Sequence, residues 1–211
     1  MSLGNTTMTT TPPIMPTPDD GYLSGQLLIA MPLMRDARFS RTVIYLCAHS
    51  QDGAMGLVLN KPTPEISFAD LIDRLEIKPD EQEPEPIGLT HDVTVHSGGP
   101  VDTGRGFVLH SPDYHADDTT VSIGGDICLT ATIDILRAIA SGEGPKQLVL
   151  ALGYAGWSPG QLESEIQGNG WLHCPATPEL VFSKNNEAIY DKALAHIGVN
   201  PAQLVSDVGH A

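Results

Sequence analysis

The chain has 211 residues, of which 41% are hydrophobic, so it is long enough and apolar enough to bury a sizeable core. Its 26 acidic and 11 basic residues give a formal net charge of −15, which repels polyanions and argues against direct binding of duplex DNA. The apolar runs are much shorter than the roughly 20 residues of a membrane helix, and no signal-peptide pattern is present, so we expect a cytoplasmic protein without membrane contact.

The cysteines predict neither a disulfide framework nor a zinc site. Cys47, Cys128 and Cys174 are odd in number, widely spaced and without a C-x-x-C pair. Cys128, expected just before a helix start, is the one candidate for a reactive thiol. The histidines and aspartates between residues 110 and 118 lack an organised ligand spacing and are read as a turn. We therefore expect no metal and no cofactor.

The first half of the chain is predicted to be mainly β. Residues 1–20 are rich in threonine and proline and are expected to form a disordered tail, followed by a single domain over 21–211. Strands are predicted at 26–30, 42–47 and 54–59. A helix then begins after Ser67, where Asp70 completes a capping box. Residues 78–86 read as a solvated acidic loop.

The second half mixes strands and helices. Strands are predicted at 93–96, 106–110 and near 120–123, and a helix at 132–141. Residues 147–152 form the most apolar strand and should be central. A short strand at 180–182 and a helix at 187–197 follow. The irregular alternation predicts an α+β fold, a mixed β-sheet flanked by helices, with α/β as the alternative.

Residues 156–160 fit the G-x-S-x-G pattern of a serine-hydrolase nucleophile elbow. In such an elbow the residue after the serine donates its backbone N–H to the oxyanion, and here that residue is Pro159, which has none. Ser158 also precedes Pro159 and Gln161 at the spacing of a capping box. We therefore read Ser158 as a helix N-cap and assign no catalytic residue.

Three arginines within seven residues are the strongest local concentration of positive charge. Arg35, Arg38 and Arg41 could together hold one anionic ligand, or each could pair with an acidic neighbour. Arg105 likewise could bind an anion, or it could form an ion pair with Asp102 or another acidic residue.

Nine segments in a fixed order resemble the AlgH-like (YqgE) family of bacterial proteins. They are residues 28–32, Asp36 with Phe39, 52–56, 60–62, 98–101, 105–110, 153–157, 160–163 and 209–211. The resemblance covers nearly all of residues 25–211 and implies a cytoplasmic protein with a mixed-sheet α+β domain. It also implies the family's label of transcriptional regulator, for which the family supplies neither a mechanism nor established catalytic residues.

Two functions remain open at this point. The first is a binding or regulatory protein that acts through a protein partner or a small anionic ligand, without direct contact to nucleic acid. The second is a small-molecule enzyme that uses a cleft lined by glycine, arginine and a histidine, His96 or His110. The candidate binding residues lie in glycine-rich turns at strand ends and beside them: Asn60, Lys61, Gly98, Gly99, Arg105, His110, Gly153 and Trp157.

Overall fold

The computed structural model describes residues 22–34, 36–77 and 93–200. Its strands are β1 (Gln26–Ala30), β2 (Val43–Ser50), β3 (Gly53–Val58), β4 (Val95–Ser97), β5 (Val101–His110), β6 (Thr120–Gly124), β7 (Ile127–Thr130), β8 (Leu148–Trp157) and β9 (Trp171–Pro175). Its helices are the 3-10 turn η1 (Ala37–Phe39) and α1 (Phe68–Arg74), α2 (Ile133–Ala140), α3 (Gln161–Gln167), α4 (Pro178–Val181) and α5 (Asn186–His196).

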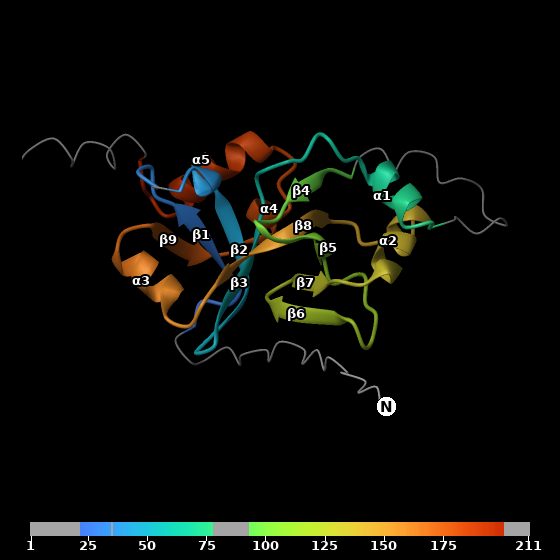
Figure 1. The fold of residues 1–211 in the computed structure, drawn as a ribbon, viewed down its shortest axis with the longest axis horizontal. Helices are drawn as coiled ribbons and strands as arrows, with labels where there is room; N and C mark the ends of the chain where they lie inside the picture. Colours follow the sequence, from blue (N-terminus) through green and yellow to red (C-terminus); the bar gives the residue numbers. More distant parts are fainter. Residues whose placement is uncertain (1–21, 35, 78–92, 201–211) are drawn as a thin grey trace, which may run out of the picture.

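The strands form one curled sheet in the order β6-β7-β5-β8-β3-β2-β1-β9, with β4 paired to β8 (Figure 1). All pairs are antiparallel except β4 with β8, which is parallel. The curl brings the two halves of the sheet together, since a Cβ on Gly25 would lie 3.9 Å from the Gly124 Cα. This mostly antiparallel sheet with helices is the predicted α+β class.

The sheet buries apolar side chains on both faces. One cluster contains Leu27, Tyr45 and Leu109 from the strands and packs against α4 and α5. The opposite face of β1, β2 and β8 carries a second cluster, which α3 covers. A third cluster joins α1 and α2 to β4, β5 and β8. Figure 1 accordingly shows α1 and α2 at one end of the molecule and α3 at the other.

Local signals in the sequence located most elements correctly. The strand predicted at 26–30 is β1, and the apolar strand predicted at 147–152 is the first part of β8, which pairs with β3, β4 and β5 at the centre of the sheet. The capping box of α1 is formed, with the Ser67 hydroxyl accepting from the Asp70 N–H and the Asp70 carboxylate accepting from the Ser67 N–H. The Ser67 hydroxyl also donates to the Asp70 carboxylate at 2.6 Å, and this bond, together with the one from the Ser67 N–H, lowers the pKa of Asp70.

The strand predicted at 180–182 is wrong, because Leu180 and Val181 belong to α4 and Phe182 is its C-cap. Thr177 caps this helix by accepting from the Leu180 N–H, and Pro178 stands at its first position.

Two strands were not predicted from the sequence, β7 and β9. β7 follows a tight turn in which Gly125 has a φ of +57°, and β9 pairs antiparallel with β1.

The capping box predicted around Ser158 is only half formed. Gln161 accepts a hydrogen bond from the Ser158 N–H at 3.0 Å, as in a capping box. However, α3 begins at Gln161 with Gly160 as its N-cap, and no side chain caps the helix. The interpretation of Ser158 as the N-cap is therefore wrong, because the turn at Gly160, with a φ of +73°, delays the helix by two residues.

Some predictions fall outside the described residues, namely the tail at 1–20, the acidic loop at 78–86 and Arg35. Within the described ranges, no helix combines the length and the hydrophobicity that crossing a membrane requires.

Candidate functional site

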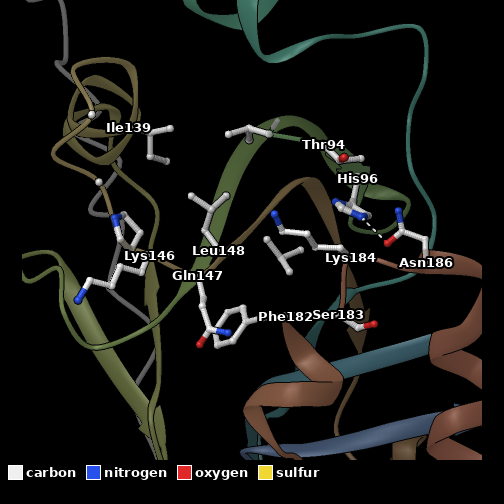
Figure 2. Close-up of a pocket in the computed structure, with 15 residues that line it drawn as sticks. Thr94, His96, Ile139, Lys146, Gln147, Leu148, Phe182, Ser183, Lys184 and Asn186 are labelled. Carbon is white, nitrogen blue, oxygen red and sulfur yellow. Dashed lines mark hydrogen bonds between the residues drawn. The ribbon is translucent and has the colours of Figure 1, made fainter. Parts of the chain in front are cut away.

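A pocket of about 350 Å³ lies where β4, the start of β8, the end of α2 and the α4–α5 turn meet (Figure 2). This volume is at the lower end of the range of about 300–1,000 Å³ typical of small-molecule sites. We call it the His96 pocket. It is lined by Val93, Thr94, His96, Ile139, Gly142, Gly144, Pro145, Lys146, Gln147, Leu148, Val149, Phe182, Ser183, Lys184 and Asn186.

The charge of the His96 pocket is opposite to that of the whole protein. Its described lining contains two lysines and a histidine but neither aspartate nor glutamate. The chain as a whole carries a net charge of −15. A lining whose described residues include no carboxylate, in so acidic a protein, is a place where an anion meets less repulsion than elsewhere on the described surface.

The two lysines are placed differently. Figure 2 shows the Lys184 side chain extending from the α4–α5 turn toward Leu148, and the Lys146 ammonium pointing away from His96. The backbone N–H of Lys146 donates to the Asp113 carboxylate at 3.2 Å, and the charge of Lys146 helps to lower the pKa of Asp113, after the larger effect of the Ser111 hydroxyl. Neither lysine forms an ion pair with a described residue. Lys184 is the better placed of the two for a ligand, because its side chain extends across the pocket (Figure 2).

His96 is buried, with 5% of its surface exposed, and both of its ring nitrogens are engaged. Nδ1 lies 3.3 Å from the Leu150 carbonyl oxygen, which only accepts, so Nδ1 carries a proton. Nε2 lies 3.1 Å from Asn186 Oδ1, 90 residues away in the sequence. The orientation of the Asn186 amide decides whether Nε2 or the amide nitrogen is the donor of this hydrogen bond.

The remainder of the pocket combines apolar walls with hydroxyl groups. Ile139, Leu148 and Phe182 supply the apolar side chains, while Thr94 and Ser183 supply hydroxyls (Figure 2). Such a mixture suits a small molecule with an apolar body and one polar end. Lys184 and Asn186 were not singled out from the sequence. Their position depends on the α4–α5 turn meeting β4, and no local pattern signals that contact.

The structure brings together three of the candidate residues predicted from the sequence, Gly98, Gly99 and Gly153. A Cβ on Gly98 would lie 2.2 Å from the Gly153 oxygen, and one on Gly153 would lie 2.6 Å from the Gly99 oxygen. The Gly98 N–H donates to the Leu152 carbonyl and the Gly98 carbonyl accepts from the Val58 N–H. The close approach that these glycines allow is therefore used by the protein's own backbone.

Arg105 lies in the irregular part of β5 that faces Gly153, and His110 ends the same strand opposite Leu148. The Arg105 guanidinium is exposed and lies 5.2 Å from the centre of the Phe107 ring, and it forms no ion pair with Asp102 or any other described residue. His110 is fully buried. Its Nδ1–H donates to the Ser111 carbonyl, while Nε2 accepts from the Thr130 hydroxyl. Burial is the main cause of its lowered pKa.

Asn60 and Lys61 hold the segment between β1 and β2. Asn60 accepts from the Val43 N–H at 3.0 Å and donates to the Arg41 carbonyl at 2.8 Å. The Lys61 ammonium donates to the Arg38 carbonyl, and burial lowers its pKa. Both side chains thus have contacts that stabilise the loop.

The arginine cluster is resolved into separate ion pairs where it is described. Arg38 makes a forked contact with Asp36, with its Nη2 2.7 Å from the carboxylate. Arg41 pairs with Asp191 at 2.9 Å and lies over the Tyr190 ring. Arg38 and Arg41 therefore each pair with an acidic side chain and do not converge on a shared anion site.

Cys128 lies within the strand β7 and not directly at the start of a helix, and burial raises the pKa of its thiol. This contradicts the setting expected for a reactive thiol. In the described part of the chain, no three or more histidine, cysteine, aspartate or glutamate side chains form a group that could hold a metal ion.

Trp157, the last of the sequence candidates, lies in a second hollow of about 710 Å³, on the α3 side of the sheet. It is lined by Met31, Pro32, Leu33, Met34, Asp36, Arg38, Phe39, Pro100, Gly156, Trp157, Gln161, Glu165, Gly168, Asn169, Gly170 and Trp171. We call it the tryptophan groove.

Known proteins closely resemble this chain. The sequence profile described as AlgH-like matches residues 27–202. A UPF0301 protein of Methylobacterium is 58% identical over 90% of this chain and 91% of its own length, and one of Nitrobacter hamburgensis is 56% identical over 92% of this chain and 90% of its own length.

Solved structures agree with these sequence matches. The solution structure of the AlgH protein from Pseudomonas aeruginosa covers 93% of this chain and 100% of its own length, with 41% identity and a TM-score of 0.71. A crystal structure from Corynebacterium diphtheriae, at 18% identity and a TM-score of 0.67, covers 86% of this chain and 91% of its own and shares the fold. The chain therefore belongs to the AlgH-like family.

Proposed function

We propose that this protein is a binding protein that takes a small anionic molecule with an apolar body into the His96 pocket, and that it regulates through this ligand or a protein partner and not by contacting DNA. The observation that carries the proposal is the reversed charge of the pocket, whose described lining holds Lys184 and no carboxylate in a protein of net charge −15. The same net charge argues against affinity for duplex DNA.

The anionic end of the ligand is expected near Lys184. An ammonium on a flexible stem binds a carboxylate or phosphate as a point charge, and the Ser183 hydroxyl beside it adds a donor. Asn186 contributes its amide, which His96 orients through their hydrogen bond. The apolar body of the ligand would rest on Ile139, Leu148 and Phe182.

Binding without chemistry is favoured over catalysis by the state of His96. A general acid or base must exchange a proton with the substrate, yet both ring nitrogens of His96 already face protein oxygens. The other histidine of the enzyme hypothesis, His110, is fully buried and lines neither hollow.

The proposal is tested by titrating the 15N-labelled protein with hexanoate and phenyl phosphate, and with the neutral hexanamide, and by following backbone amide shifts. We expect saturable shifts around Thr94, Leu148 and Lys184 with the two anions. Lys184→Gln should weaken anion binding about tenfold, which corresponds to one charge-assisted hydrogen bond. Lys192→Gln, which removes an exposed lysine of α5 outside the pocket, is the matched control and should leave the affinity unchanged.

Two results would overturn the proposal. Hexanamide binding as tightly as hexanoate would show that the pocket does not select for charge. Equal weakening by the two lysine variants would mean that the anions associate diffusely with the surface. Melting temperatures of both variants, measured alongside, ensure that lost binding is not lost folding.

A further inference from the structure

We infer that the tryptophan groove is a docking site for a segment of a partner protein that carries apolar side chains next to lysine or arginine. The groove lies on the α3 side of the sheet, and its described lining shares no residue with that of the His96 pocket. The inference therefore stands independently of the proposed function.

The first observation is exposed apolar surface. Leu33 has 59% of its surface exposed, the largest value among the large hydrophobic side chains of the described residues. Val101, 38% exposed, directly follows Pro100, which lines the groove. Met31 and Met34 add flexible apolar side chains to the same wall. Apolar surface gathered around a groove in this way is typical of protein interaction sites.

The second observation is the rigid base of the groove. The indole N–H groups of Trp157 and Trp171 donate to the same Glu165 oxygen, at 2.9 and 2.8 Å, and Gln161 donates to the other oxygen at 2.9 Å. The two indole rings meet edge to face, with their centres 6.0 Å apart, and Phe39 packs against Trp171. A preformed base of this kind binds a partner without first having to become ordered.

The third observation concerns charge. Among the residues that the structure describes, the groove is lined by two carboxylates, Glu165 and Asp36, and by one cation, Arg38, which is held on Asp36. The net charge of −15 steers basic partners toward the protein and repels a second copy of it. The occupant that fits is therefore apolar and basic.

The chain offers a built-in reporter for this groove, because its only two tryptophans are Trp157 and Trp171. The probe is a synthetic, end-blocked peptide of alternating leucine and lysine, compared with a matched peptide of leucine and glutamate. We expect the lysine peptide to change the tryptophan emission saturably, with an affinity that falls as salt is raised. The glutamate peptide should bind at least about tenfold more weakly.

Two variants locate the binding. Leu33→Ser should weaken the lysine peptide about tenfold, the loss typical of a central apolar contact. Leu75→Ser is the matched control, because Leu75 is also exposed, at 44%, but lies outside the groove, and it should bind the peptide like the unaltered protein. Lys184→Gln should also leave peptide binding unchanged.

The inference is wrong if the two leucine variants bind alike, if the glutamate peptide binds as well as the lysine peptide, or if no saturable change is seen. It is also wrong if sedimentation equilibrium finds a dimer that Leu33→Ser dissociates, since the groove would then be occupied by a second copy. None of these outcomes depends on whether the His96 pocket binds an anion.

Discussion

The contact between the Gly98–Gly99 segment and β8 makes a quantitative prediction about Gly153. Replacement of Gly153 by alanine has two separate effects. The residue has a φ of +72°, a conformation that costs a residue with a Cβ about 1–2 kcal/mol. The new Cβ would also lie 2.6 Å from the Gly99 oxygen and 2.9 Å from the Val101 oxygen. Overpacking of this kind typically costs about 1–3 kcal/mol.

Two further variants separate these effects. Gly160 has a φ of +73° with nothing within 4 Å of its would-be Cβ, so Gly160→Ala should show the conformational cost alone. Gly98 has no positive φ, but its Cβ would lie 2.2 Å from the Gly153 oxygen, so Gly98→Ala should show the packing cost alone. Gly104→Ala, with open space and no positive φ, should change the free energy of unfolding by less than about 0.5 kcal/mol.

We expect Gly153→Ala to lower the free energy of unfolding by about 2–5 kcal/mol, the sum of the two effects. Urea unfolding followed by circular dichroism measures this directly. For a chain of this length each kcal/mol corresponds to a fall of about 2–4 °C in the melting temperature. If Gly153→Ala costs no more than Gly160→Ala, the close backbone contact contributes nothing and the reasoning fails.

Three other predictions follow from the described contacts. Ser158→Ala should change the free energy of unfolding by less than about 0.5 kcal/mol, whereas Gln161→Ala should cost about 1 kcal/mol, because the Gln161 side-chain oxygen accepts a hydrogen bond from the Ser158 N–H. Urea unfolding compares the two variants, and a larger loss from Ser158→Ala would contradict this assignment. Burial lowers the pKa of His110 in the folded protein, so below about pH 6.5 the unfolded chain binds the proton more readily than the folded one. The free energy of unfolding should therefore decrease as the pH is lowered. Unfolding at pH 7.5 and at pH 5.5 measures this loss, which should be smaller in His110→Asn. The purified protein should not shift a duplex DNA fragment in a gel at physiological salt, and salt-sensitive micromolar binding would refute the argument from charge.

The features predicted correctly from the sequence are those encoded by neighbouring residues. The box of Ser67 and Asp70 needs only a spacing of three, and β1 needs only a short apolar run bounded by a glycine. The missed strands depend on distant partners. Trp171–Pro175 contains a histidine and ends in proline, and it becomes a strand because β1 offers it hydrogen bonds. Thr177 and Pro178 did signal a helix start, but the short apolar run after them was read as a strand.

The candidate site was predicted less well, for the same physical reason. Trp157 was selected as a residue beside a glycine-rich turn and lines the tryptophan groove, but its role in binding stays a prediction. His96 was proposed only as one of two histidines that could act as acid or base in an enzyme, since nothing near it in the sequence indicates that Asn186 would engage its ring. The meeting of His96 with Lys184 depends on the parallel pairing of β4 with β8 and on the turn between α4 and α5, which no local pattern specifies.

One continuous piece of backbone, β8, reaches both hollows. Leu148 and Val149 at its start line the His96 pocket, and Gly156 and Trp157 at its end line the tryptophan groove, about 30 Å along the strand. Between these two ends, Gly153 packs directly against the Gly99 carbonyl, and this close contact fixes the position of the strand at its midpoint. A displacement at one end of β8 should therefore stop at Gly153, so that each hollow can be occupied without disturbing the other.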